Sequence, residues 1–249
     1  MNGEPTVLIT GAAGALGGAT TDAFLGAGFA VLGVDRAEHD PGWVSARPSY
    51  TPLQLDLEHS GAGEVLADAI AGQQLSHVVT IAGGALPGEP ESTEDPLHAE
   101  VELFRASVEA NLTTQYRTIH AVAPALGASP GDRSITLCGS FNALSAQGMP
   151  GYSAAKAGLL GMMHALVDPF GRQGIRVNVL APGTVRTPRT ERLWAHVEGH
   201  FERLERSTAL GRLATPADIG RSSLALATQL THVTGQVLVV DGGQTVVHR

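Results

Sequence analysis

The chain has 249 residues, of which 43% are hydrophobic and 16% charged, enough apolar sequence for the core of one large α/β domain. Its formal net charge of -8 argues against non-specific nucleic-acid binding. No apolar run reaches the roughly 18 residues of a membrane span, no basic leader precedes the first apolar stretch, and Cys138 is the only cysteine, so we expect a cytoplasmic protein.

Short β-branched runs alternate with longer segments rich in alanine and leucine along the whole chain. This alternation is typical of strand–helix–strand units on a parallel sheet. We therefore predict a Rossmann-type, doubly wound α/β fold: a seven-stranded parallel sheet with helices on both faces, in a single domain over 1–249. The predicted strands are 5–10, 30–34, 51–55, 76–81, 133–138, 175–180 and 236–240, and the predicted helices are 15–28, 61–72, 97–126, 151–172 and 215–229.

Two segments, 84–96 and 184–210, fit none of these elements. The first is rich in proline, glutamate and glycine, and the second in arginine, threonine and histidine. Both follow the carboxyl ends of predicted strands, where ligands bind to open α/β sheets. We interpret residues 184–210 as a lid over a substrate site.

A glycine-rich turn joins the first predicted strand to the first predicted helix, in the order Thr10-Gly11-Ala12-Ala13-Gly14-Ala15-Leu16-Gly17. Glycines here let backbone N–H groups approach a pyrophosphate at the positive end of the helix. Taken alone, the turn also fits a tight connection that binds nothing.

Acidic residues end the next two predicted strands. Asp35 lies eighteen residues after Gly17, where a carboxylate accepts hydrogen bonds from an adenosine ribose and repels a 2′-phosphate. This favours NAD over NADP. Arg36 works against that preference, although the glycine turn carries no basic side chain. Asp56 ends the third strand and either meets an adenine amino group or caps the strand.

Lys156 is the only lysine in a chain with fifteen arginines, and it follows Tyr152 by four residues. Residues four apart share one face of a helix, so the phenol and the ammonium can reach one site. The alternative is a solvated pair on the helix surface. An ammonium about 4 Å away, at an effective dielectric constant of about 20, stabilises a tyrosinate by about 4 kcal/mol. That energy would lower the pKa of Tyr152 by about three units, toward neutrality.

These motifs resemble the short-chain dehydrogenase/reductase family over nearly the whole chain. The turn Thr10–Gly17 resembles the family's Thr-Gly-x-x-x-Gly-x-Gly element, and Tyr152–Lys156 matches its Tyr-x-x-x-Lys element. The segment 178–187 resembles the family's nicotinamide-binding stretch, and 241–243 resembles its C-terminal turn. The resemblance implies four catalytic residues, which are Asn111, Ser140, Tyr152 and Lys156.

The resemblance also implies which residues contact the cofactor, NAD rather than NADP. They are Gly11, Gly14, Leu16, Gly17, Asp35, Arg36, Asp56, Leu57, Ala82, Gly83, Tyr152, Lys156, Pro182, Gly183, Val185 and Thr187. In the implied mechanism Ser140 orients the substrate oxygen and Lys156 also holds the nicotinamide ribose. Asn111 holds a water that links Lys156 to solvent. No metal is expected.

Two positions depart from the family pattern. Ala15 stands where the middle glycine of the turn usually falls, with Gly14 beside it. Ile81 follows the fourth predicted strand, where the family commonly has an asparagine that ties neighbouring strands together. We therefore expect a local change in the hydrogen bonding of the sheet.

Other polar groups have plainer interpretations. His196 and His200 flank Glu198 at helix-like spacing, but no third metal ligand is evident, so we interpret them as lid residues. Cys138 is interpreted as a packed thiol. Arginines at 186, 189 and 192 of the lid either receive an acidic substrate or lie on the surface.

We therefore expect an oxidoreductase that transfers a hydride between NAD(H) and a small or medium secondary alcohol or ketone. The alternative enzyme is a 3-oxoacyl-thioester reductase, and the alternative without catalysis is an NAD(H)-sensing binding protein. Small residues line the helix of Tyr152, and the family's equivalent helices build subunit interfaces, so the resemblance implies a homotetramer. Neither nucleic-acid nor membrane partners are expected.

Overall fold

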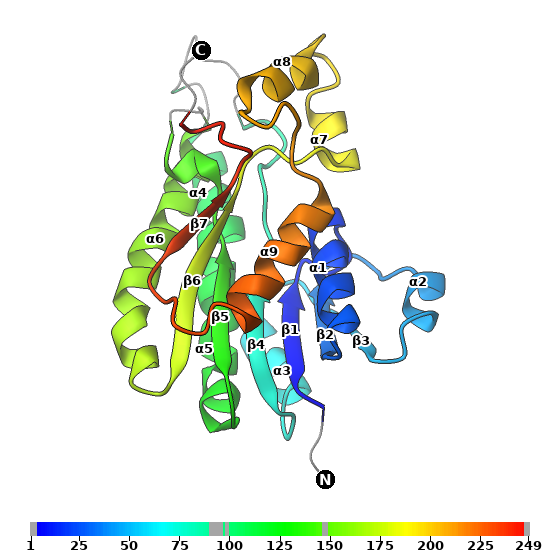
Figure 1. Ribbon diagram of the computed structural model, residues 1–249, viewed down its shortest axis with the longest axis vertical. Helices are drawn as coiled ribbons and strands as arrows, with labels where there is room; N and C mark the ends of the chain where they lie inside the picture. The colour runs from blue at the N-terminus through cyan, green and yellow to red at the C-terminus, as the bar shows by residue number, and fades with distance from the viewer. Residues whose placement is uncertain (1–3, 90–96, 98–99, 146–148, 247–249) are drawn as a thin grey trace.

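The computed structural model describes residues 4–89, 97, 100–145 and 149–246. Its strands are β1 Thr6–Thr10, β2 Ala30–Asp35, β3 Tyr50–Gln54, β4 Leu75–Thr80, β5 Arg133–Cys138, β6 Ile175–Pro182 and β7 Val237–Val240. They form one sheet in the order β3-β2-β1-β4-β5-β6-β7, and every pairing is parallel (Figure 1). The predicted seven-stranded, doubly wound fold is confirmed. Strand order reverses between β1 and β4, which opens a crevice at the carboxyl edge of the sheet.

Nine α-helices connect or flank the strands within the described residues. They are α1 Ala15–Gly26, α2 Pro41–Ser45, α3 Ala62–Ala69, α4 Val101–Val108, α5 Thr114–Ala128, α6 Pro150–Gly171, α7 Pro188–Leu193, α8 His200–Ser207 and α9 Pro216–Thr228. A π-helical turn, η1 Glu109–Thr113, separates α4 from α5, and a 3₁₀ turn, η2 Phe141–Ala143, follows β5. The single helix predicted over 97–126 is therefore wrong in its middle, and residues 98–99 lie outside the described residues, as do 90–96 of the unassigned segment.

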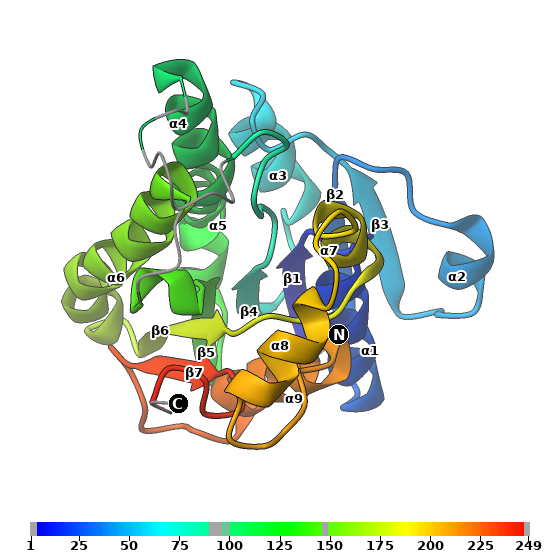
Figure 2. The same ribbon diagram turned by 90° about the horizontal axis from the view of Figure 1, so that it is seen from above.

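Helices cover both faces of the sheet, as Figure 2 shows from above. On one face α3, α5 and α6 bury Leu66, Ile119 and Met163 against strand residues such as Val78 and Ile135. On the other face α1 and α9 pack against each other and bury Phe24 and Ala227 against Val7 and Ile9. Because both faces are covered, the central strands are rich in valine, isoleucine and leucine, which is why they could be predicted from their β-branched runs.

The short helices α7 and α8 occupy the predicted lid and lie beyond the carboxyl edge of the sheet (Figure 1). Thr187 starts α7 with a capping box, in which its hydroxyl accepts from the Thr190 backbone N–H and the Thr190 hydroxyl accepts from the Thr187 N–H. Over the described residues, no helix combines the length and the apolar character that a bilayer span requires.

His77 is a buried polar side chain within β4. Its Nδ1 lies 2.9 Å from the Ser134 hydroxyl on β5, and its ring packs edge-on against Phe29. Burial lowers the pKa of His77 to about 4, well below the usual value near 6.5. The folded protein therefore keeps this imidazole neutral at pH values where the unfolded chain would protonate it.

Linkage makes His77 a source of acid sensitivity. Between about pH 6.5 and pH 4 the unfolded state binds the proton that the folded state refuses, so stability falls as the pH falls. We expect this residue to account for a loss of about 2 kcal/mol between pH 7 and pH 5. Urea unfolding at both pH values should show a smaller loss for His77→Gln, whereas His164→Gln, on the exposed face of α6, should behave as the unmodified protein. An equal loss in His77→Gln would contradict the assignment.

Candidate active site

A cavity of about 720 Å³ lies at the carboxyl edge of the sheet. It is lined by every residue that the sequence predicted to contact the cofactor, together with Ser140. Of the predicted site residues, only Asn111 does not line this cavity. Gly11 and Thr187, which are 176 positions apart in the chain, thus meet in one place, because the carboxyl ends of parallel strands share one edge.

The glycine turn approaches the helix too closely for side chains. A Cβ on Gly17 would lie 1.9 Å from the Gly11 carbonyl oxygen, and Gly11 itself has a φ of +71°. Ala15 is the first residue of α1, and Gly14 precedes it in extended conformation as the cap. The departure at Ala15 therefore leaves the turn closed, with an exposed methyl group at the cavity wall.

Asp35 connects the end of β2 to the glycine turn. One of its carboxylate oxygens accepts from the Ala13 N–H at 3.0 Å, and the other accepts from the Ala37 N–H at 2.9 Å. Arg36 turns toward Glu58 instead, with 3.7 Å between their charged groups. Because Arg36 pairs with Glu58, its positive charge at this end of the cavity is balanced by a carboxylate.

Asp56 also acts locally. Its Oδ1 accepts from the Glu58 N–H at 3.0 Å, the arrangement expected of a cap at the end of a strand. This contact fits the strand-end cap, and Asp56 also lines the cavity, so its contact with an adenine stays a prediction.

Tyr152 and Lys156 share one face of α6, next to the end of β5. Lys156 is 2% exposed, its ammonium donates to the Cys138 carbonyl at 2.8 Å, and it lies 5.6 Å from the centre of the Tyr152 ring. The alternative of a solvated surface pair is therefore wrong. Ser140 is 5% exposed and stands in the same part of the cavity, two residues beyond that carbonyl.

The expected lowering of the Tyr152 pKa is not found. Burial raises the pKa of Tyr152 to about 12, while a hydrogen bond with Ser140 acts in the opposite direction. Burial likewise lowers the pKa of Lys156. The Coulomb argument left out the cost of desolvation, which is the largest influence on both groups. In this structure Tyr152 is a protonated acid at neutral pH.

Asn111 lies in the π-helical turn η1 and is fully buried. Its side chain bonds both backbone groups of Gly84, accepting from the N–H at 2.7 Å and donating to the carbonyl at 3.1 Å. A Cβ on Gly83 would lie 2.6 Å from its Oδ1. The side chain thus shapes the loop after β4 rather than facing Lys156, and the water-holding role stays a prediction.

Gln115 is a connecting residue that the sequence analysis missed. Its amide N–H₂ donates to the Asn111 carbonyl at 3.2 Å and to the Cys138 carbonyl at 3.1 Å, so it shares an acceptor with Lys156. The Thr80 hydroxyl at the end of β4 donates to its Oε1 at 2.5 Å. Thr80 and Gln115 therefore tie β4 to β5 beside Ile81, while a change in hydrogen bonding caused by the missing asparagine stays a prediction.

Glu89 is a second residue that sequence reasoning missed. This carboxylate is 6% exposed and accepts from the Tyr152 N–H at 2.9 Å, the Ser107 hydroxyl at 2.8 Å and the Leu86 N–H at 2.6 Å. It caps the first turn of α6, where a negative charge is stabilised by the helix dipole. Nothing in the sequence indicated this contact, because Glu89 lies 63 positions from Tyr152 and belongs to the segment 84–96, for which no element was predicted.

The lid side of the cavity is aromatic and basic. Trp194 stacks on His200 with 4.2 Å between ring centres, and both line the cavity with Arg189 and Arg192.

No group of three metal-ligating side chains occurs among the described residues. Cys138 is buried, and burial raises the pKa of its thiol, consistent with a packed side chain.

Comparison with known proteins gives consistent matches over almost the full length. A family model described as Enoyl-(Acyl carrier protein) reductase matches residues 11–245. An uncharacterized oxidoreductase of Schizosaccharomyces pombe, C922.06, is 34% identical over 95% of this chain and 89% of its own length. A Rhizobium meliloti protein named "Probable galactose dehydrogenase GalD" is 29% identical over 95% of this chain and 93% of its own.

One solved structure shares both sequence and fold. It is an oxidoreductase of the short-chain dehydrogenase/reductase family from Burkholderia thailandensis, 36% identical, with a TM-score of 0.88 over 100% of this chain and 95% of that one. The segment matched by the family model includes both Tyr152 and Lys156.

Proposed function

The chain belongs to the short-chain dehydrogenase/reductase family, and on that premise we propose that it transfers a hydride between NAD(H) and a secondary alcohol or ketone. One observation carries the proposal. The only lysine of the chain is buried beside Tyr152 and Ser140, at the edge of the sheet where the glycine turn opens. A buried ammonium is costly, so such a placement points to a catalytic use.

The residues present fit a dinucleotide. The close approach of Gly17 to Gly11 leaves a cradle at the positive end of α1 that suits a pyrophosphate. Asp35 would receive the adenosine ribose, while Ala82, Gly83, Pro182, Gly183, Val185 and Thr187 line the far side of the cavity. When bound, the cofactor accepts a hydride from the alcohol carbon or returns one to the ketone.

The four proposed catalytic residues then handle the oxygen and its proton. Ser140 orients the substrate oxygen, and Tyr152 gives a proton to it during reduction or takes one during oxidation. Because the pKa of Tyr152 is raised to about 12, its phenol is already protonated for reduction at neutral pH. Lys156 positions the nicotinamide ribose, and Asn111 holds the loop that faces it.

NAD is the preferred cofactor in this proposal. Three carboxylates line the adenosine end of the cavity, at Asp35, Asp56 and Glu58, against the single guanidinium of Arg36, which is paired with Glu58. A 2′-phosphate would add negative charge beside Asp35, which is unfavourable at close range. The balance of charge therefore supports NAD over NADP.

A 3-oxoacyl thioester is the second candidate substrate, because the matching family model is described by an acyl-carrier-protein reaction. A protein that only senses NAD(H) is the candidate outside catalysis. A panel of secondary alcohols, ketones and an acetoacetyl thioester, assayed with NADH and NADPH, separates these functions. NADH binding without turnover of any carbonyl would favour the sensor.

We predict that Tyr152→Phe lowers kcat by at least about 100-fold, since the proton donor is removed. Binding of NADH, followed by its fluorescence, should change little. Tyr116→Phe provides the matched control, because this tyrosine is 51% exposed on α5 and does not line the cavity. Retained turnover in Tyr152→Phe would refute the proposed mechanism.

We also predict that Asp35→Ala raises the ratio of kcat/KM with NADPH to kcat/KM with NADH by about tenfold or more, through loss of like-charge repulsion. Using the ratio removes any common effect of loosening the turn at Ala13. The exposed Asp68→Ala on α3 serves as the control. An unchanged ratio would show that Asp35 does not select the cofactor.

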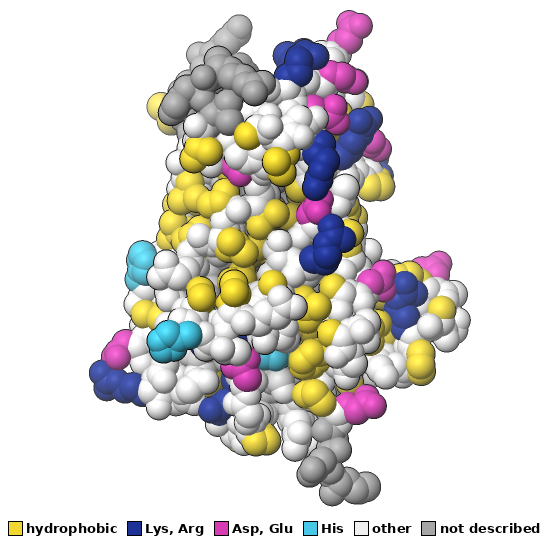
Figure 3. Space-filling view, in the orientation of Figure 1, with side chains coloured by type: hydrophobic (Ala, Val, Ile, Leu, Met, Phe, Trp, Pro, Cys, Tyr) yellow, Lys and Arg dark blue, Asp and Glu magenta, His cyan; other side chains and the backbone are white. Residues whose placement is uncertain are grey.

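We further propose that the chain acts as one domain, in the cytoplasm, as a homotetramer. β7 is the outer strand of the sheet, its four residues Val237–Val240 are all half-buried, and Figure 3 shows hydrophobic side chains gathered over this face. Small side chains at Ala154, Ala157 and Gly161 lie on the outer face of α6. Two separate self-complementary faces suit a tetramer with two-fold symmetry.

Sedimentation velocity should give four times the chain mass of 25.7 kDa, and a monomer would contradict this.

A further inference from the structure

The two ends of the cavity carry opposite charge. Carboxylates line the adenosine end, whereas the described residues include no carboxylate in the lining beyond Ser140 and Tyr152. That end instead receives Arg189 and Arg192 from α7. Figure 3 shows basic and acidic side chains interleaved where α7 and α8 lie, but the two charged side chains of α7 that line the cavity are both arginines. The region in which a substrate would meet Tyr152 is therefore positively charged.

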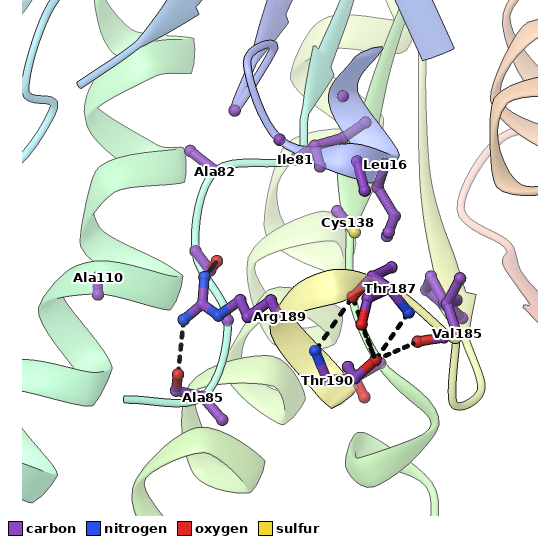
Figure 4. Close-up of a pocket in the computed structure, with 18 of the residues that line it drawn as sticks. Leu16, Ile81, Ala82, Ala85, Ala110, Cys138, Val185, Thr187, Arg189 and Thr190 are labelled. Carbon is purple, nitrogen blue, oxygen red and sulfur yellow. Dashed lines mark hydrogen bonds between the residues drawn. The ribbon is translucent and has the colours of Figure 1, made fainter. Parts of the chain in front are cut away.

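Arg189 is held against the cavity wall. Its guanidinium donates to the Gly83 carbonyl at 3.2 Å and to the Ala85 carbonyl at 2.6 Å, so it reaches from the lid to the loop after β4 (Figure 4). A Cβ on Gly84 would lie 3.1 Å from the guanidinium. These two bonds use two of the five N–H groups of an arginine, which leaves donors for a ligand.

The charge of Arg189 is not neutralised by a carboxylate in the described part of the chain. Its neighbour Arg186 differs, since it pairs with Glu191 at 3.0 Å and does not line the cavity. The buried Glu89 is satisfied by three donors and is also absent from the lining. Two backbone carbonyls fix the position of Arg189 without cancelling its charge.

The field of Arg189 reaches the proposed catalytic pair. Its positive charge acts to lower the pKa of Tyr152 and of Lys156, although burial is the larger influence on both. Because Arg189 lines the same cavity as Tyr152 and Ser140, an anion bound at Arg189 would share that cavity with the reacting oxygen. In Figure 4 Arg189 extends toward Ala85 and away from Leu16, whereas the cradle for the pyrophosphate lies at the start of α1.

We propose that Arg189, assisted by Arg192, is a specificity-determining residue that binds an anionic oxygen group of the substrate, a carboxylate or a phosphate, near the alcohol or ketone. The substrate class is thus a small hydroxy or oxo acid, or a phosphate ester of a small hydroxy ketone. The planar guanidinium matches the two oxygens of either group. This inference rests on the proposed function, because it concerns the same cavity.

The test compares matched ligands by calorimetry in the presence of NAD⁺. One pair is 3-oxobutanoate and its methyl ester, and the other is dihydroxyacetone phosphate and dihydroxyacetone. In the unmodified protein one anion should bind about 10- to 100-fold more tightly than its neutral partner. Arg189→Met should remove that preference, and Arg192→Met should reduce it. Arg186→Met is the matched control and should keep it.

Each outcome is decisive. The pair that shows the preference identifies carboxylate or phosphate as the recognised group. The proposal fails if neither anion is preferred, if Arg189→Met keeps the preference, or if Arg189→Met weakens NADH binding instead, which would assign this arginine to the cofactor. Thermal unfolding verifies that each variant is folded. Failure of the proposed function would be seen in a different measurement. It would appear as an absence of turnover across the carbonyl panel, whether or not the protein prefers the anionic ligands.

Discussion

The burial of the Lys156 ammonium is the constraint on which the rest of the site depends. A charge with 2% exposure needs a strong acceptor, and the Cys138 carbonyl at the end of β5 provides one at 2.8 Å. That contact brings the first turns of α6 against the carboxyl edge of the sheet and places Tyr152 above Ser140. Gln115 donates to the same carbonyl, so β5, α5 and α6 meet at one backbone oxygen, and Thr80 of β4 joins them through the Gln115 side chain.

Electrostatics around Tyr152 show why proximity alone does not set a pKa. Burial and the Glu89 carboxylate favour the neutral phenol, while Ser140 and Arg189 favour the phenolate, and burial dominates. Glu89 also caps the helix that carries Tyr152. The same site therefore combines a protonated acid, a buried ammonium and an arginine fixed on the lid, a set suited to a polar, anionic substrate more than to a purely apolar one.

Much of the fold could be predicted because buried parallel strands are rich in β-branched and other apolar residues, and all seven were located to within two residues at either end. The short helices were missed. α2 and α7 span five and six residues, too few for a periodic pattern, and α8 begins after Gly199 with a φ of +64°. The π-helical turn at Glu109–Thr113 also escaped prediction, since inserting one extra residue into a helical turn leaves no mark on composition.

By itself the sequence determined the sheet, the glycine turn, Asp35 and the Tyr152–Lys156 pair, because each depends on local spacing or on short-range backbone geometry. Only the tertiary structure decided what surrounds them: the contacts of Lys156 with Cys138, of Glu89 with Tyr152 and of Arg189 with Ala85. These join residues 18, 63 and 104 positions apart. Such pairs are set by where strands and loops converge at one edge of the sheet, and so are the desolvation energies that control the pKa values.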